Sequence, residues 1–250
     1  MLGTLESVRD RIITTIAADD NMNMSTADRY FHVGEDALRV IQKCILTAGV
    51  PEPERILDFG CGWGRVTRFL RAGYPVADIV ACDVSPSAVK FNQQTFGSRS
   101  LQSSHDLDQI SLPAGFDLIW SGSVITHITE ASCRSLLRHF EQALVPDGLM
   151  VFTTHGRYAH GRRARHEITY NITDEEFGKI DQCWKRGAFG WVGYKGNAVY
   201  GISLLPPAWI FKYLEQTTEL RLVAYIERGW DDHQDVIAIQ KQPIHASRPG

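Results

Sequence analysis

The chain has 250 residues, with 26 lysine and arginine against 29 aspartate and glutamate side chains and a formal net charge of -3. A chain of this length can bury one sizeable α/β core, and its slight acidity excludes an overall basic field of the kind that attracts nucleic acid. The five cysteines form no C-x-x-C pair, so we expect neither disulfides nor a zinc site. No apolar run reaches membrane-spanning length, and the first residues lack the apolar core of a signal peptide. We therefore expect a cytoplasmic protein without a membrane segment.

The first fifty residues show two helical patterns separated by a polar stretch. In residues 4–18 apolar side chains recur at helical spacing, which predicts an amphipathic helix. Residues 19–28 are rich in Asp and Asn and are expected to form a loop. Helical spacing returns over residues 34–48 and ends at Gly49, a residue type that favours helix ends. We therefore expect residues 1–50 to form a helical arm.

The middle of the chain alternates short apolar runs with helical patterns. Strands are predicted at 55–59, 78–82, 116–120 and 148–154, with a less well-defined third strand near 99–104, and helices at 64–72, 86–96 and 130–144. This alternation is typical of a parallel sheet with helices on both faces. Ligands of such sheets bind beyond the carboxyl ends of the strands.

The alternation breaks after residue 155. Residues 156–205 are basic at first and then rich in aromatic residues and glycine, and we expect an insertion at the upper edge of the sheet. A helix should follow from Pro206 to about Thr217, and strands near 220–227 and 235–240 should close the domain. The chain is thus predicted to be a single domain, 1–250, divided into the arm 1–50, a core 51–155, the insertion 156–205 and a closing part 206–241.

The most informative stretch is RILDFGCGWGRVTRF, residues 55–69. Its apolar strand delivers Asp58 into a turn with glycines at 60, 62 and 64, followed by a helix. Glycine permits positive φ and leaves no Cβ between backbone and ligand. The spacing is G-x-G-x-G, whereas the dinucleotide fingerprint is G-x-G-x-x-G. A carboxylate at Asp58 would repel a pyrophosphate and attract a cationic amino-acid end, which disfavours nicotinamide-dependent reduction.

These residues, with VACDVSPSAV, FDLIWSGSVITHI and LVPDGLMVFTTHG, resemble the motifs of the class I S-adenosylmethionine-dependent methyltransferases. The resemblance covers residues 30–156, and QDVIAIQ fits the closing strand. It implies an α/β fold with a doubly wound, Rossmann-like, seven-stranded sheet, mostly parallel with an antiparallel last strand. It also implies S-adenosyl-L-methionine as cofactor, bound by residues 51–155, with 156–205 on the acceptor side and the arm 1–50 as a lid.

The resemblance assigns cofactor-binding roles residue by residue. Asp83, at a strand end, would accept the ribose hydroxyls, with Val84 beside the adenine and Asp106, in competition with Asp108, at the adenine amino group. The arm would contribute Tyr30 and Gly34, although Tyr30 could equally fasten the arm to the core. The remaining cofactor residues implied are Asp58, Gly60, Cys61, Gly62, Gly64, Arg65 and Ser121.

Three histidines follow strand ends at the edge that would hold the reactive methyl group. They are His127, His155 and His233. We predict an acid–base role for His155 first and for His127 next, because hydroxyl acceptors usually need a base. Each histidine could instead only hold its own loop or cap a helix. The histidines and nearby carboxylates are unpaired in sequence, so no metal site is predicted.

The insertion begins with Arg157, Arg162, Arg163 and Arg165, which could bind an anionic acceptor or form a solvated loop. Its aromatic residues could stack on a sugar or form a small core of their own. No N-P-P-[YF] sequence for nitrogen methylation stands after strand four, so oxygen or carbon is favoured. We predict methyl transfer to a small polar acceptor, at an oxygen of a sugar-like or carboxylated metabolite; the alternative is a catalytically silent cofactor-binding or regulatory protein. The sequence carries no signal of oligomeric state.

Overall fold

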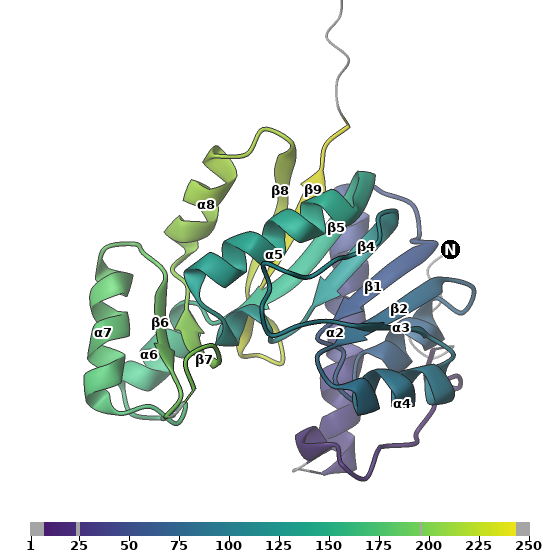
Figure 1. Cartoon of the computed structure of the whole chain (residues 1–250), viewed down its shortest axis with the longest axis horizontal. Coiled ribbons are helices and arrows are strands. Elements are labelled where there is room, and N and C mark those ends of the chain that lie inside the picture. Colours follow the sequence, from purple (N-terminus) through teal and green to yellow (C-terminus); the bar gives the residue numbers. More distant parts are fainter. Residues whose placement is uncertain (1–7, 24–25, 196, 244–250) are drawn as a thin grey trace, which may run out of the picture.

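Over the residues that the computed structural model describes, 8–23, 26–195 and 197–243, the centre of the protein is a seven-stranded sheet (Figure 1). Its strand order is β3-β2-β1-β4-β5-β9-β8, and β9 runs antiparallel to both of its neighbours while β1 to β5 are mutually parallel. The strands are β1 Arg55–Phe59, β2 Asp78–Asp83, β3 Arg99–Gln102, β4 Phe116–Ser121, β5 Leu144–Thr154, β8 Leu220–Trp230 and β9 Gln234–Lys241. This confirms the sheet predicted from the sequence.

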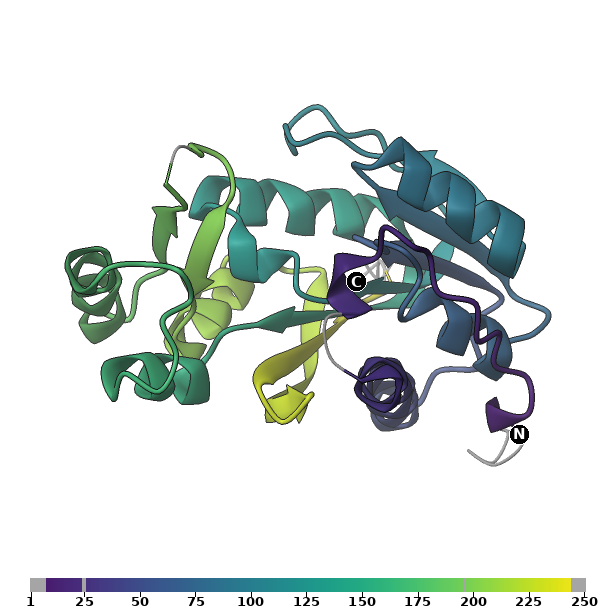
Figure 2. The ribbon, with the colours of Figure 1, turned by 90° about the horizontal axis from the view of Figure 1, so that it is seen from below.

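Both faces of the central strands are buried, so their sequences are nearly continuous apolar runs. On one face α2 (Ala27–Ala48) and α3 (Thr67–Gly73) pack, and on the other α5 (Glu130–Ala143) and α8 (Pro207–Glu215). Figure 2 shows α2 and α5 on opposite sides of the sheet. The helix α4 (Pro86–Phe96) contacts β2 and β3. Within the described residues, no helix combines the length and apolarity needed to cross a membrane.

The predicted helix at residues 4–18 is wrong over most of its described part, in which only Val8 and Arg9 are helical. Residues 1–7 lie outside the described residues, and from Ile12 onward the chain runs without helix up to the short turn η1 (Asn21–Asn23). The stretch from residue 12 to residue 16 is almost entirely β-branched, which disfavours helix. Its carbonyl groups instead accept hydrogen bonds from the guanidinium of Arg68, which is 1% exposed.

The second helix of the arm is longer than predicted. α2 begins at Ala27, seven positions before the predicted start, and its first turn is capped by the Thr26 hydroxyl, which accepts from the Arg29 N–H. The polar Asp/Asn pattern therefore hid the helix start. The C-terminal end was placed correctly, because Gly49 adopts the left-handed conformation at φ 70°.

The insertion is an ordered subassembly at one end of the sheet. It consists of α6 (Arg157–Ala164), α7 (Asp174–Lys185) and the antiparallel pair β6 (Gly190–Gly193) and β7 (Gly201–Leu204). Figure 1 shows these elements at the left, where β5 ends, next to α8. They share a small apolar cluster to which Trp184 and Tyr194 belong, as the core alternative predicted.

Candidate functional site

The turn after β1 brings backbone rather than side chains to the edge of the sheet. Gly60, Gly62 and Gly64 have φ angles of 77°, 51° and 81°. The N–H groups of Gly60 and Cys61 donate to the carbonyl of Cys82 at 2.8 and 3.0 Å, which ties the turn to the end of β2. A Cβ at Gly62 would meet no atom within 4 Å, so this backbone faces open space.

A cavity of about 330 Å³ lies above this turn at the carboxyl ends of β1, β2 and β4. Its wall is built by the arm, the glycine turn, the ends of β2 and β4 with the loops that follow them, the loop after β3, the loop before β7 and the end of β8. The polar or aromatic wall residues include Asp20, Asp58, Trp63, Arg65, Asp83, Ser103, Ser104, His105, Ser123, His127, Tyr200 and Trp230.

Asp58 is a buried carboxylate on the wall of this cavity. Its side chain is 1% exposed, and its Oδ2 accepts a hydrogen bond of 2.6 Å from the Thr67 hydroxyl. Burial raises the pKa of Asp58 to about 7; the Thr67 hydrogen bond opposes this shift and the negative charge of Asp83 adds to it. Such a carboxylate lacks a cation and would be stabilised in its charged form by a positively charged ligand group.

Asp83 stands at the end of β2 and joins the turn to the next helix. Its Oδ2 accepts from the Gly62 N–H at 2.8 Å, and its Oδ1 accepts from the Ser85 N–H at 2.9 Å. Each carboxylate oxygen keeps a further lone pair for a ligand hydroxyl. Val84 beside it is 37% exposed and lines the same cavity.

The structure brings most of the predicted cofactor residues to the cavity. The wall includes Asp58, Gly60, Cys61, Gly62, Arg65, Asp83 and Val84. Gly64 lies just behind the turn, where a Cβ would collide with the Phe96 ring and Asn92. Ser121 is fully buried between Trp120 and Gly122, which line the cavity in its place.

Two predicted contacts from the arm lie behind the wall. The Tyr30 hydroxyl donates to Asp20 at 2.6 Å, and Tyr30 is 1% exposed, so it fastens the arm and fixes a carboxylate that does line the cavity. A Cβ at Gly34 would clash with the Arg65 carbonyl and with Phe69, so this glycine allows α2 to lie close to the turn.

Asp106 also lies off the cavity wall. It is exposed, and its carboxylate accepts from the Asp108 N–H at 3.1 Å and from the Gln109 side chain at 2.7 Å. The preceding residues Ser104 and His105 line the cavity instead. A carboxylate engaged in its own turn is not aimed at a ligand, which is the physical reason for this difference from the prediction.

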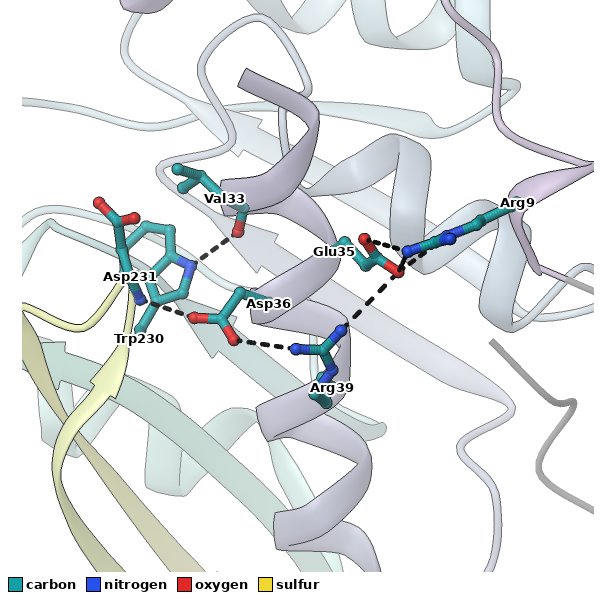
Figure 3. Close-up of polar contacts among 7 residues, drawn as sticks. All are labelled: Arg9, Val33, Glu35, Asp36, Arg39, Trp230 and Asp231. Carbon is teal, nitrogen blue, oxygen red and sulfur yellow. Dashed lines mark hydrogen bonds and ion pairs between the residues drawn. The ribbon is translucent and has the colours of Figure 1, made fainter. Parts of the chain in front are cut away.

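Sequence reasoning missed the contribution of the β8–β9 turn. The Trp230 ring lines the cavity, and its Nε1 donates to the Val33 carbonyl of α2 at 2.9 Å. The next residue donates its N–H to Asp36 at 2.7 Å (Figure 3). These contacts join positions almost 200 residues apart, and no local pattern in the sequence signals them.

A second cavity, of about 340 Å³, adjoins the first. The two share Ser123 and His127, which therefore stand where they meet. Its wall is formed by the ends of β4 and β5, by the insertion and by the loop before α7. The lining residues are Ser123, His127, His155, Ile168, Thr169, Tyr170, Asn171, Tyr194 and Ile202.

The three predicted histidines do lie at the same edge of the sheet. His127 and His155 line the second cavity, and the His233 ring lies 5.4 Å from the His155 ring, centroid to centroid. His233 does not line the wall; its Nε2 is 2.9 Å from the Tyr170 hydroxyl. The prediction of convergence is therefore confirmed for these side chains.

Their electrostatic environments differ. Burial, and then the neighbouring His233 and His127, lower the pKa of His155 to about 3, and its Nδ1 has no hydrogen-bond partner. Burial also lowers the pKa of His127. The His127 Nδ1 lies 2.8 Å from the Gly201 carbonyl, which can only accept, so Nδ1 carries the proton and Nε2 the lone pair.

Ser123 is held rigidly where the two cavities meet. It has φ 60°, a conformation that non-glycine residues adopt only where neighbours hold it. Its N–H donates to the Thr153 hydroxyl at 2.7 Å, that hydroxyl donates to Gln234 at 2.6 Å, and the Gln234 amide returns to the Ser123 hydroxyl at 3.1 Å. This closed network fixes the backbone between β4 and η2 (Ile125–His127).

The basic run of the insertion is paired within the chain. Arg163, whose side chain is 3% exposed, donates to Asp174 at 2.7 Å. The other three pair with glutamates: Arg157 with Glu227, and Arg162 and Arg165 with Glu167. None of these four arginines lines either cavity, so the structure does not support the predicted grip on an anionic acceptor.

Similarity to known proteins centres on the glycine turn and the strands around it. Residues 57–150 match the family model described as a methyltransferase domain. These residues are therefore similar to a methyltransferase domain, and the chain shares the fold of solved S-adenosylmethionine-dependent methyltransferases. The sheet order, with its antiparallel β9, agrees with that similarity, and α6 to β7 lie outside the matched residues. Across the described part of the chain, no group of three or more His, Cys, Asp or Glu side chains is arranged to hold a metal ion.

Individual relatives are distant. The chain is 26% identical over 145 residues to the malonyl-[acyl-carrier protein] O-methyltransferase of Anoxybacillus flavithermus, covering 58% of this chain and 52% of that protein. The chain thus spans about half the length of the curated relative it matches. Among solved structures, a TehB-like methyltransferase from Corynebacterium glutamicum is 21% identical, with 83% of this chain and 88% of that chain covered and a TM-score of 0.51. N-methyltransferase NodS from Bradyrhizobium japonicum, in complex with S-adenosyl-l-homocysteine, is 15% identical, with 96% and 98% covered and a TM-score of 0.52.

Proposed function

We propose that the protein transfers a methyl group from S-adenosyl-L-methionine to an oxygen of a small polar acceptor. The observation that carries this proposal is the buried, cation-free Asp58 behind an open glycine turn, within the residues that match a methyltransferase domain. In the same proposal residues 51–155 bind the cofactor, and the insertion, 156–205, with the β8–β9 turn forms the acceptor side.

The residues on the cavity wall fit the cofactor group by group. Asp58 would balance the ammonium of the methionine end, where a positive charge removes the cost of a buried carboxylate. Asp83, held by two backbone N–H groups, would accept the ribose hydroxyls. Val84 and Leu107 offer apolar contacts for the adenine. When bound, the cofactor supplies an electrophilic methyl group.

His127 is the better candidate for the proton acceptor, ahead of His155. Its hydrogen bond to Gly201 fixes the tautomer with a free Nε2, and its ring stacks on Tyr200 at 4.7 Å, which restricts its motion. His155, with a pKa of about 3, binds a proton too weakly to serve well near neutral pH. An oxygen acceptor is supported by the names of the curated relatives, which are O-methyltransferases.

The test is titration calorimetry with S-adenosylhomocysteine. Asp83→Ala removes two backbone hydrogen bonds and the ligand contact, and we expect affinity to fall by at least about tenfold. Asp106→Ala is the matched control, because its carboxylate is off the wall, and its affinity should stay within about twofold of the parent. Equal losses in the two variants would contradict the assignment of the cavity.

Turnover is tested separately, with His127→Ala. We expect the rate to fall by about 10²- to 10⁴-fold while S-adenosylhomocysteine affinity changes little. Cofactor binding without methylation of any acceptor would favour the catalytically silent alternative.

A further inference from the structure

We propose that the second cavity binds the acceptor and that this acceptor is an uncharged ring bearing at least two hydroxyl groups, with His155 anchoring the hydroxyl that is not methylated. This inference rests on the proposed function and names its substrate class. It excludes the carboxylated acceptor that the sequence left open.

The wall of the second cavity is polar, but its described residues include no cationic side chain that could pair with an anion. Among the described residues that line it there is no Arg, Lys, Asp or Glu, and its polar groups are hydroxyls, an amide and imidazoles. A carboxylate transferred here would lose its hydration without meeting a cation, which disfavours its binding. A hydroxyl has no such cost, because it can donate to or accept from any of these groups.

Two arginines of α6, Arg162 and Arg163, are already paired with carboxylates. Arg162, whose positive charge contributes to lowering the pKa of His233, is paired with Glu167 at 3.3 Å. Arg163 is buried against Asp174, and neither arginine lines the cavity. Recruiting either for an anionic acceptor would require breaking an existing ion pair.

His155 supplies an independent sign of a ligand. Its side chain is 4% exposed, it lines the cavity, and its Nδ1 has no hydrogen-bond partner among the described residues. A buried polar atom left unpaired destabilises the fold, and native structures rarely keep one without a reason. A ligand hydroxyl would satisfy it whichever tautomer is present, because a hydroxyl both donates and accepts.

Two hydroxyl positions follow from the arrangement of the histidines. His127 stands where the cavities meet and keeps the lone pair of Nε2, so it suits the hydroxyl that reacts. His155 lines only the second cavity, so it suits a hydroxyl further from the cofactor. The rings of Tyr170 and Tyr194 line the same cavity and offer faces on which a ring can pack.

The experiment uses two matched pairs of probes with the full chain loaded with S-adenosylhomocysteine. The neutral methyl β-D-glucopyranoside is compared with the carboxylated methyl β-D-glucuronide, and the neutral catechol with the carboxylated 2,3-dihydroxybenzoate. Malonyl-pantetheine serves as a carboxylated thioester. Binding is measured by saturation-transfer NMR and calorimetry. We expect at least one neutral probe to bind about tenfold or more tightly than its carboxylated partner. The sugar pair and the phenol pair together show whether the hydroxylated ring is a carbohydrate or an aromatic ring.

Two variants test the residues involved. His155→Phe keeps the volume and removes the nitrogen atoms, and should weaken the neutral probe by about tenfold without changing S-adenosylhomocysteine affinity. Thr169→Arg, at an exposed position of the wall, supplies the missing cation and should raise affinity for the carboxylated partner by about threefold or more. This second variant keeps the test decisive if the first does not fold.

Tighter binding of a carboxylated probe to the parent protein would overturn the inference and leave the proposed methyl transfer intact. Failure of every neutral probe to bind would also overturn it. A protein that does not bind S-adenosylhomocysteine at all would instead refute the proposed function.

Discussion

Asp58→Asn should make the ligand-free protein more stable and its cofactor site weaker. The substitution keeps the shape of the side chain and the oxygen that accepts from Thr67, and it removes the charge. In the folded protein the pKa of Asp58 rises from its usual value of 3.8 to about 7, so the folded state retains a proton that the unfolded chain releases between these values.

The sign and size follow from linkage. As pH rises from 3.8 to 7 the raised pKa of Asp58 progressively destabilises the folded protein, and above pH 7 the full penalty is present. A difference of about 3 pKa units corresponds to about 4 kcal/mol at pH 8, and to less than about 2 kcal/mol at pH 5. The neutral amide escapes this penalty. We therefore expect Asp58→Asn to raise the free energy of unfolding by up to about 4 kcal/mol at pH 8, with the gain shrinking toward pH 5.

The assay is urea unfolding of the ligand-free protein at both pH values, followed by circular dichroism, together with calorimetry for S-adenosylhomocysteine. Loss of a buried charge pair should weaken the ligand by at least about 30-fold. Asp106→Asn, on an exposed carboxylate, should leave both quantities nearly unchanged. A variant no more stable than the parent at pH 8, or a gain that does not shrink at pH 5, would refute the reasoning.

Gly64→Ala should lower the free energy of unfolding by about 1–3 kcal/mol in urea unfolding, because φ is 81° and a Cβ would collide with Phe96. A Cβ at Gly62 meets no neighbour within 4 Å, so Gly62→Ala should lose more S-adenosylhomocysteine affinity in calorimetry, and less stability, than Gly64→Ala. A greater loss of affinity in Gly64→Ala would contradict this. Trp230→Phe removes the hydrogen bond to the Val33 carbonyl and should lower stability by about 0.5–1.5 kcal/mol in the same unfolding assay, with weaker ligand binding as well. Turnover should survive chelators in an activity assay, since the described residues hold no metal-binding cluster.

The sheet was predictable because its signals are local. Each buried parallel strand is a short apolar run, and the turn after β1 needs glycine at fixed positions. The same holds for Asp58 and Asp83, which stand at strand ends. The arm was harder, because Ile12 and Ile16 fit a helical period while the buried guanidinium of Arg68 binds the backbone between them in a non-helical form. A tertiary contact of this kind does not change the spacing of apolar residues along the sequence, so the spacing cannot predict it.

Site residues far apart in sequence were beyond prediction for the same reason. The sequence leaves Tyr30 open between a cofactor contact and a residue that fastens the arm, and in the structure it holds Asp20, whose carboxylate lies on the wall. The arginines of the insertion read as a binding surface, because their partners, such as Glu227 and Asp174, come from other segments. The histidines were predictable as a group, since strand ends meet at one edge, but their ranking depends on burial that only the fold determines.

The first cavity takes wall residues from both ends of the chain, Asp20 near the start and Trp230 near the end. During synthesis, the ribosome therefore produces β1 and the glycine turn long before the residue that closes the site. The nascent chain can fold its early strands, but it cannot acquire full affinity for its ligand until β8 has left the exit tunnel. Ligand capture should thus follow the emergence of β8, which makes the ligand a stabiliser of the assembled site and not of earlier translation intermediates.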